Sequence, residues 1–200
     1  MALTGAPFAL VSVTVSTIAF AAFVVVADRF FRRIIGDSAS LAALAVIAFA
    51  PVSPVFQVGY AESLGMLFLA VVLVGLAERR WFLTALFIPL AALTRPVGVP
   101  LALAVLVIAV IAWRGRRARG SLIGLVTLAG LSGLAWPAIA WWVTGRQTAY
   151  LDTELAWRRP YTGDNEHGWG TGWWDSAVWW FQDAAPWVIG GLALVAVIVA

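Results

Sequence analysis

The stretch "YAESLGMLFLAVVLVGLAERRWFLTALFIPLAALTRPVG", residues 60–98, contains two apolar runs separated by a short charged turn. Glu62 precedes the first run, Glu78 and two arginines form the turn, and Arg95 ends the second run. Apolar runs with charges only at their ends are typical of helices that cross a lipid bilayer. The stretch therefore predicts two membrane helices that run in opposite directions, with charged residues at both surfaces.

The composition of the whole chain agrees with this interpretation. Of its 200 residues, 62% are hydrophobic and only 12% are charged, and the mean hydropathy is +0.94. A soluble domain could not cover its surface with so few polar residues. The expected fold is all-α, a polytopic transmembrane helical bundle in the cell membrane. The absence of cysteine excludes disulfides and thiolate metal sites.

Seven apolar segments are expected, with clusters of arginine between some of them. The segments are 7–27, 40–56, 63–77, 82–93, 97–113, 122–143 and 187–200. The arginine clusters lie at 29–33, 79–80 and 114–119, and cytoplasmic loops of membrane proteins are rich in arginine. This rule places the three clusters in the cytoplasm. It places the N-terminus, Glu62, Arg95 and the long segment after Val143 outside. The basic residues therefore indicate orientation, and nucleic-acid binding is not expected.

The break at Arg95 and Pro96 separates the fourth and fifth segments. We expect a helical hairpin with its tip at the outer surface, and a re-entrant pair is the alternative. Three regions follow from this topology: a helical bundle over 1–143, an outer Trp-rich loop over 144–186, and the start of a further helix over 187–200. The last helix is short and no signal peptide precedes the first, so we expect a fragment of a longer protein.

The outer loop holds six of the twelve tryptophans of the chain. Its sequence "WWDSAVWWFQD" has the spacing of a short amphipathic helix lying in the membrane interface. Its tryptophans either form an aromatic belt that anchors the loop or a platform for a sugar ring or lipid tail. The platform for a sugar ring or lipid tail would contain Trp157, Trp173 and Trp174. The nearby Asp164, Glu166 and His167 lack two further ligands, so no metal site is predicted.

Glu62 and Arg95 are expected at the same depth and on the same side of the membrane. Arg95 either extends to lipid headgroups or grips a phosphate in its two-pronged fork, with the Thr94 hydroxyl as a second donor. Glu62 either favours the start of a helix, where Ser63 is the better cap, or lines a polar pocket with Tyr60 and Arg95. Such a pocket suits a lipid-linked substrate whose phosphate lies at the interface.

These motifs resemble the PIG-V group of mannosyltransferases. The resemblance covers residues 53–159, and a later stretch, "GRQTAYLDTELAWRR", is similar to the outer segment of bacterial members. The matching positions are Pro51, Pro54, Tyr60, Ala61, Glu62, Ser63, Leu64, Leu93, Thr94, Arg95, Pro96, Gly98, Gln147, Tyr150 and Trp157.

The resemblance implies a GT-C glycosyltransferase of the bacterial plasma membrane. Such an enzyme transfers mannose from a polyprenyl-phosphate donor to a lipid or glycan acceptor on the outer side, and needs no metal or other cofactor. Arg95 and Thr94 would bind the donor phosphate, while Tyr60 and Glu62 would shape the pocket. The outer loop, with Trp157, Trp173 and Trp174, would close over the acceptor.

The catalytic base of this family is an aspartate in a "W-D" motif of the first outer loop, and no position before Phe56 matches it. Asp28 is expected on the cytoplasmic side, and Asp175 follows six segments, so neither takes this role. We therefore expect the catalytic module to be missing and the chain alone to be inactive. The alternatives are a transporter or flippase of a lipid-linked sugar, with broken helices at its prolines, and a non-enzymatic membrane subunit.

Overall fold

The computed structural model describes residues 7–95, 97–112, 119–162 and 171–199. All regular structure in these residues is helical, which confirms the all-α prediction. The contacts divide the chain into two compact units, Met1–Gln147 and Thr148–Ala200. Each unit is described by itself below.

The first helix, α1 (Phe8–Ile35), has 28 residues, which corresponds to about 42 Å at 1.5 Å per residue. Two arginines, Arg32 and Arg33, lie in its last turn, where a cation favours the negative end of the helix dipole. The chain reverses at Gly36, whose φ of 81° suits a residue without a Cβ atom. Helix α2 (Asp37–Phe49) then packs against α1, so the apolar segments 7–27 and 40–56 form neighbouring helices.

The predicted segment 40–56 is interrupted. Helix α2 ends at Phe49, and a short 3-10 helix, η1 (Ser53–Gln57), follows with a proline in its first turn. The hydroxyl of Ser53 donates a 2.7 Å hydrogen bond to the carbonyl of Ile47, which fixes this corner. The segment from η1 onward leads the chain across to the start of α3.

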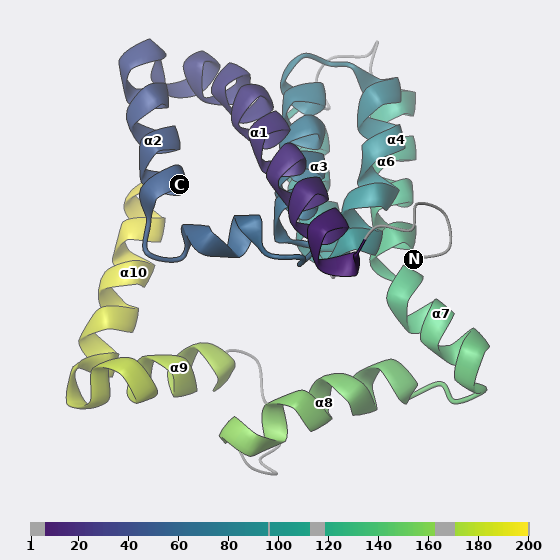
Figure 1. The fold of residues 1–200 in the computed structure, drawn as a ribbon, viewed down its shortest axis with the longest axis vertical. Helices are drawn as coiled ribbons and strands as arrows, with labels where there is room; N and C mark the ends of the chain where they lie inside the picture. The colour runs from purple at the N-terminus through teal and green to yellow at the C-terminus, as the bar shows by residue number, and fades with distance from the viewer. Residues whose placement is uncertain (1–6, 96, 113–118, 163–170, 200) are drawn as a thin grey trace. The chain divides into compact units, whose positions relative to one another are not determined.

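Helices α3 (Glu62–Ala77) and α4 (Trp81–Thr94) form the hairpin expected from residues 60–98. They approach closely at Gly75, where an added Cβ atom would lie 2.5 Å from the Thr84 hydroxyl oxygen. Arg79 takes a positive φ of 58° in the tight turn between them. Figure 1 shows α1 lying beside α3, and the two helices are in extensive contact.

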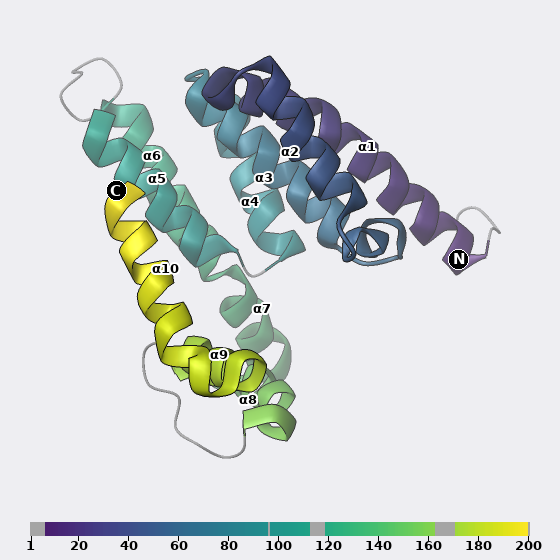
Figure 2. The ribbon, with the colours of Figure 1, turned by 90° about the vertical axis from the view of Figure 1, so that its left-hand side faces the viewer.

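Helices α5 (Gly98–Ala112) and α6 (Arg119–Gly133) lie side by side (Figure 2) and pack against α4. The larger hydrophobic core joins these helices to α3, through buried side chains that include Val72, Ile88, Val105 and Leu125. The start of α5 meets the end of α6, because a Cβ atom on Gly98 would lie 2.3 Å from the Cα atom of Gly133. The two helices are therefore antiparallel.

The apolar segment 122–143, expected as one helix, is divided between α6 and α7 (Ala135–Thr144), which meet at a bend of 40°. Among the described residues, α1 is the one helix long and apolar enough to cross a membrane, and the pair α6–α7 would be a second if it forms a single span. The helices α2, α3 and α4 are apolar but shorter. By length and composition alone, the described residues thus contain one candidate span, or two if the bent pair is counted as one.

The second unit contains α8 (Ala149–Thr162), α9 (Thr171–Phe181), a 3-10 helix η3 (Gln182–Ala184) and α10 (Ala185–Val199). Helix α9 is the short helix predicted from "WWDSAVWWFQD". It packs against α10, so the end of the predicted outer loop and the predicted final helix belong to one compact unit. The division falls after Gln147, and the sequence-based boundary was 143/144.

Candidate functional site

The fold brings Glu62 and Arg95 together, although 32 residues separate them in the sequence. Arg95 Nη2 donates a 2.7 Å hydrogen bond to Glu62 Oε1, and the contact is also an ion pair. Glu62 is the first residue of α3, and Arg95 directly follows α4. The hairpin of α3 and α4 therefore explains the pair: its two open ends lie at the same level.

Arg95 reaches Glu62 because the chain leaves its helix there. Its backbone is extended, with φ −146° and ψ 154°. This conformation is expected of a residue before proline, because the proline ring disfavours the helical region for its predecessor. The Arg95 amide still donates to the carbonyl of Ala91. The last turn of α4 thus anchors the backbone while the side chain extends across to α3.

The carboxylate of Glu62 is only half satisfied. Oε1 accepts the bond from Arg95, but Oε2 is buried and has no hydrogen-bond partner. The Glu62 side chain is 23% exposed and that of Arg95 is 44% exposed. In the part of the chain that the structure describes, Arg95 has no side-chain partner other than Glu62. The pair therefore combines a partly exposed guanidinium with a buried carboxylate oxygen that has no partner.

Gly65, one turn after Glu62, makes room for the arginine stem. A Cβ atom on Gly65 would lie 3.4 Å from Cγ and 3.6 Å from Cδ of Arg95, and 3.7 Å from the methyl group of Thr94. The aliphatic part of Arg95 lies across α3 at this position. Gly65 is not among the residues that the sequence predicts for this site. Gly65 follows Glu62 by three residues, so both lie on neighbouring faces of one helix. This spacing is the sequence signal that could have predicted its place beside the ion pair.

Ser63 does not have the predicted role of helix cap. The residue at the N-cap position is Ala61, without a side-chain cap. The Ser63 hydroxyl is buried and donates a 2.7 Å bond to the carbonyl of Phe56. The hydroxyl stabilises the preceding bend instead, because it satisfies a carbonyl of η1 that the irregular chain leaves unpaired.

The segment before Glu62 is held against α1 by three contacts. The rings of Phe20 and Phe56 stack with centroids 4.7 Å apart and planes within 7°. Ser16 donates a 3.4 Å hydrogen bond to the carbonyl of Tyr60. At Gly59 an added Cβ atom would lie 2.5 Å from the Ser12 hydroxyl oxygen. These contacts fix the position of the start of α3, and hence of Glu62.

Tyr60 and Thr94 flank the pair. The Tyr60 side chain is 66% exposed, so it is accessible at this end of the molecule. The Thr94 hydroxyl donates a 2.6 Å bond to the carbonyl of Leu90 within its own helix. Its hydrogen is therefore engaged, and the oxygen is left as an acceptor rather than the predicted second phosphate donor.

The opposite end of α3 carries a different charged group. Both oxygens of Glu78 are engaged: Arg29 bonds Oε1, and Arg80 lies 2.9 Å from Oε2. The hydrogen bond from Arg29 lowers the pKa of the Glu78 carboxyl below its ordinary value. Asp28 is bonded by both Arg32 and Ser40. The first two predicted arginine clusters therefore meet at one end, which we call the arginine end.

The remaining predicted residues lie in the second unit. Trp157 of α8 is 74% exposed and Trp174 of α9 is 48% exposed, so both present aromatic surface. The side chain of Trp173, and the whole of Asp164, Glu166 and His167, lie outside the described residues. No group of three or more metal-ligating side chains occurs in the residues that the structure describes.

Comparison of the chain with family models, with curated proteins and with solved structures returns no match.

Proposed function

We propose that this chain is part of an integral membrane glycosyltransferase. The reaction is transfer of mannose from a polyprenyl-phosphate donor to a lipid or glycan acceptor, on the outer face of a bacterial plasma membrane. The observation that carries the proposal is the ion pair of Glu62 and Arg95, at the end of α3 opposite the arginine end. A guanidinium at the outer surface is well placed to meet a lipid phosphate.

A multi-pass arrangement of about seven spans is part of the proposal. It is supported by large apolar side chains that are exposed on helices throughout the first unit, among them Val25, Val46, Phe82 and Val110. A soluble protein rarely exposes so many large apolar side chains, whereas lipid would cover them. Helices α3, α4 and α5 have 14 to 16 residues, short of the ~20 of a typical span. Thinning of the bilayer and extension of flanking arginines accommodate such short helices.

The chemistry follows from the leaving group. When an acceptor hydroxyl displaces the lipid phosphate at the anomeric carbon, negative charge develops on the phosphate oxygens. A fixed cation stabilises that charge most strongly where water is partly excluded. Arg95 has N–H groups that are not used by Glu62, and they can form a fork to phosphate. Glu62 holds the guanidinium in place while Tyr60 lines the sugar side.

The catalytic base is not assigned to a residue of this chain. Asp28 belongs to the arginine end, where Arg32 and Ser40 bond its carboxylate. Asp175 is exposed on α9 in the second unit. No observation links either aspartate to Arg95. The proposal is therefore limited to donor binding and stabilisation of the leaving phosphate.

A lipid-linked sugar flippase is the second candidate, favoured by the 40° bend between α6 and α7. Transporters often place their sites where helices are broken within the membrane. The two candidates differ in their products. A transferase yields a mannosylated acceptor, whereas a flippase moves the intact donor between leaflets of a proteoliposome.

The test compares Arg95→Ala and Arg95→Lys with Arg79→Ala, which removes the same charge at the arginine end and leaves the ion pairs of Glu78 intact. Binding of radiolabelled polyprenyl-phosphate mannose to the chain in nanodiscs is measured first, and mannosyl transfer in cell membranes that contain the protein second. We expect Arg95→Ala to weaken binding by roughly tenfold or more, Arg95→Lys by less, and Arg79→Ala to have no effect. Undiminished binding and transfer in Arg95→Ala would remove Arg95 from the mechanism.

A further inference from the structure

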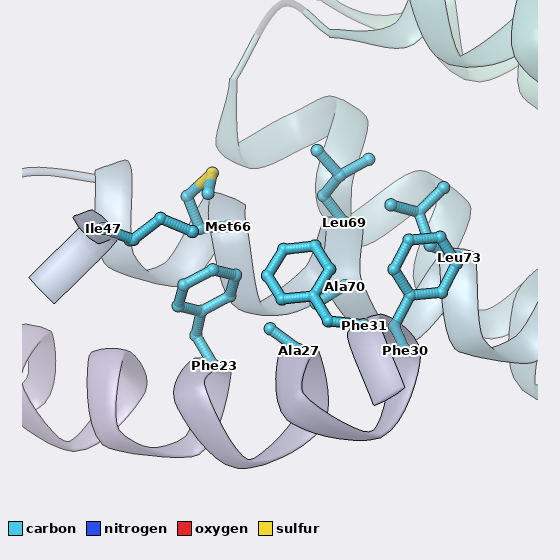
Figure 3. Close-up of a pocket in the computed structure, with 9 residues that line it drawn as sticks. All are labelled: Phe23, Ala27, Phe30, Phe31, Ile47, Met66, Leu69, Ala70 and Leu73. Carbon is cyan, nitrogen blue, oxygen red and sulfur yellow. The ribbon is translucent and has the colours of Figure 1, made fainter. Parts of the chain in front are cut away.

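An apolar hollow of about 100 Å³ lies between α1, α2 and α3. Figure 3 shows its lining, in which Phe23 and Phe30 of α1 face Met66 and Leu73 of α3, with Ile47 of α2 at one end. Every side chain that lines it is apolar. A hollow of this character does not bind a sugar or a phosphate, because either would lose its hydrogen bonds to water without replacement. Its chemistry fits a hydrocarbon chain.

The arginine end lies close to the Phe30 and Leu73 side of this hollow. Arg29 precedes Phe30 in α1, and Arg33 lies one turn beyond it. Arg29 and Arg80 share the carboxylate of Glu78, and the charge of Arg33 also acts on that carboxylate. Three arginines thus surround one glutamate, which leaves an excess of two positive charges. Arg33 has no ion-pair partner in the described part of the chain.

We propose that the hollow binds one acyl chain of an anionic phospholipid, whose phosphate lies against Arg33 and the neighbouring arginines. Burial of the methylene groups of the chain favours such binding. Basic side chains beside an apolar groove at the cytoplasmic surface select anionic over zwitterionic headgroups. The hollow provides apolar surface for the acyl chain. The uncompensated positive charge of the arginine end attracts the anionic headgroup.

The occupant differs from the proposed sugar donor. The stripe of α3 that faces the hollow consists of Met66, Leu69, Ala70 and Leu73. At 100° per residue, the middle of this stripe lies roughly 90° around the helix from Gly65, the position that Arg95 packs against. The donor phosphate would also lie at the opposite end of α3. The lipid site therefore rests on the proposed membrane placement, and not on the proposed sugar transfer.

The experiment uses the chain in nanodiscs that contain phosphatidylglycerol or phosphatidylcholine, each with the same acyl chain carrying a photoreactive diazirine. After illumination, mass spectrometry maps the labelled residues. We expect label on the residues of the hollow, about fivefold more from phosphatidylglycerol than from phosphatidylcholine, as for one arginine contact near the surface. Arg33→Gln should remove most of this preference.

Two tryptophan variants separate the hollow from the general lipid-facing surface. Leu69→Trp fills the hollow and should lower its labelling by both lipids. Leu41→Trp, at an exposed position of α2 outside the hollow, should leave the labelling unchanged. Equal labelling by the two lipids, or label spread evenly over exposed residues such as Ile18, would overturn the site. A chain that does not insert would instead contradict the membrane placement itself.

Discussion

Both ends of α3 carry a glutamate that pairs with arginine, but the two carboxylates differ in how many of their oxygens have a partner. At the arginine end, Glu78 uses both oxygens, one for Arg29 and one for Arg80. At the other end, Glu62 uses one oxygen for Arg95 and leaves the second buried without a partner. A carboxylate with two partners stabilises a helix junction. At the Glu62 end the buried second oxygen is unsatisfied, and Arg95 keeps N–H groups that Glu62 does not use and that a ligand can accept from.

The two ends differ because the backbone has a different conformation at their arginines. Arg29 lies on a regular helix and Arg80 in a tight turn, so both are fixed by local structure. Arg95 stands where the chain leaves α4 in an extended conformation. The break lets the Arg95 side chain extend across to α3, where it is 44% exposed, less than the 59% of Arg29 and the 57% of Arg80. From the difference in carboxylate partners we propose that the arginine end stabilises the bundle and that the Glu62–Arg95 end is the ligand site.

The strongest test of the comparison is whether the two ends face opposite sides of a membrane. The chain has no cysteine, so single cysteines can be introduced without background. Tyr60→Cys should react with a membrane-impermeant maleimide in intact cells, and Arg33→Cys only after permeabilisation. We expect labelling to differ by roughly tenfold or more in intact cells, because charged reagents do not cross the hydrocarbon layer. Labelling of both positions from one side would contradict the topology.

The next largest effect concerns the break that carries Arg95. A Cβ atom on Gly98 would meet the backbone of Gly133 at 2.3 Å, so the helices must shift to accept Gly98→Ala. We expect a loss of about 3 kcal/mol in the free energy of unfolding, measured by thermal or denaturant unfolding in detergent. The control is Gly130→Ala in α6, where nothing lies within 4 Å. It should be neutral or stabilising by up to about 1 kcal/mol, and equal effects would refute the close approach.

A smaller effect compares the ion pairs directly. Arg95→Ala deprives Glu62 of its one partner, whereas Arg29→Ala leaves Glu78 with Arg80. Because Arg95 is 44% exposed, solvent screens the pair, and we expect a loss of about 1 kcal/mol in unfolding free energy. Arg29→Ala should cost less. If the order is reversed, the Glu62–Arg95 pair is not the less satisfied of the two.

The smallest effect is a pH dependence at the arginine end. The hydrogen bond from Arg29 lowers the pKa of Glu78 below its ordinary value of 4.5. Folding therefore favours the ionised carboxylate: its stabilising contribution is complete above pH 4.5 and is lost as the pH falls through the lower folded-state pKa. We expect Glu78→Gln to flatten the loss of stability in acid, as measured by unfolding between neutral pH and pH 3.

The matched variants Arg29→Gln and Arg80→Gln refine this expectation. Arg29 is the largest cause of the lowered pKa of Glu78, and the charge of Arg80 contributes less. Arg29→Gln should therefore flatten the acid profile more than Arg80→Gln does. Equal profiles in the two variants would show that the Arg29 hydrogen bond does not dominate in solution.

Most helices could be predicted from the apolar runs, but α8 within the predicted outer loop, the extension of α1 to Ile35 and three helix boundaries could not. The chain breaks after Phe49, bends between α6 and α7, and places Ala61 rather than Ser63 at the start of α3. The sequence is apolar on both sides of the first two breaks, so hydropathy carries no signal there. The available signal was proline: Pro51 and Pro54 follow the first break, and Pro137 follows the second. Ser63 prefers a distant carbonyl, that of Phe56, and such a partner is invisible in the local sequence.

The sequence by itself determined that the chain is helical and apolar, with Glu62 and Arg95 at the ends of neighbouring runs. Composition and charge position suffice for this, because burial of apolar area and the cost of a charge in lipid are local properties. The tertiary structure decided that the two residues meet at 2.7 Å, that Gly65 admits the arginine stem, and that one oxygen of Glu62 is left free. Hydrogen bonding acts over a few ångströms, and only the packing of α3 against α4 brings these atoms within that range.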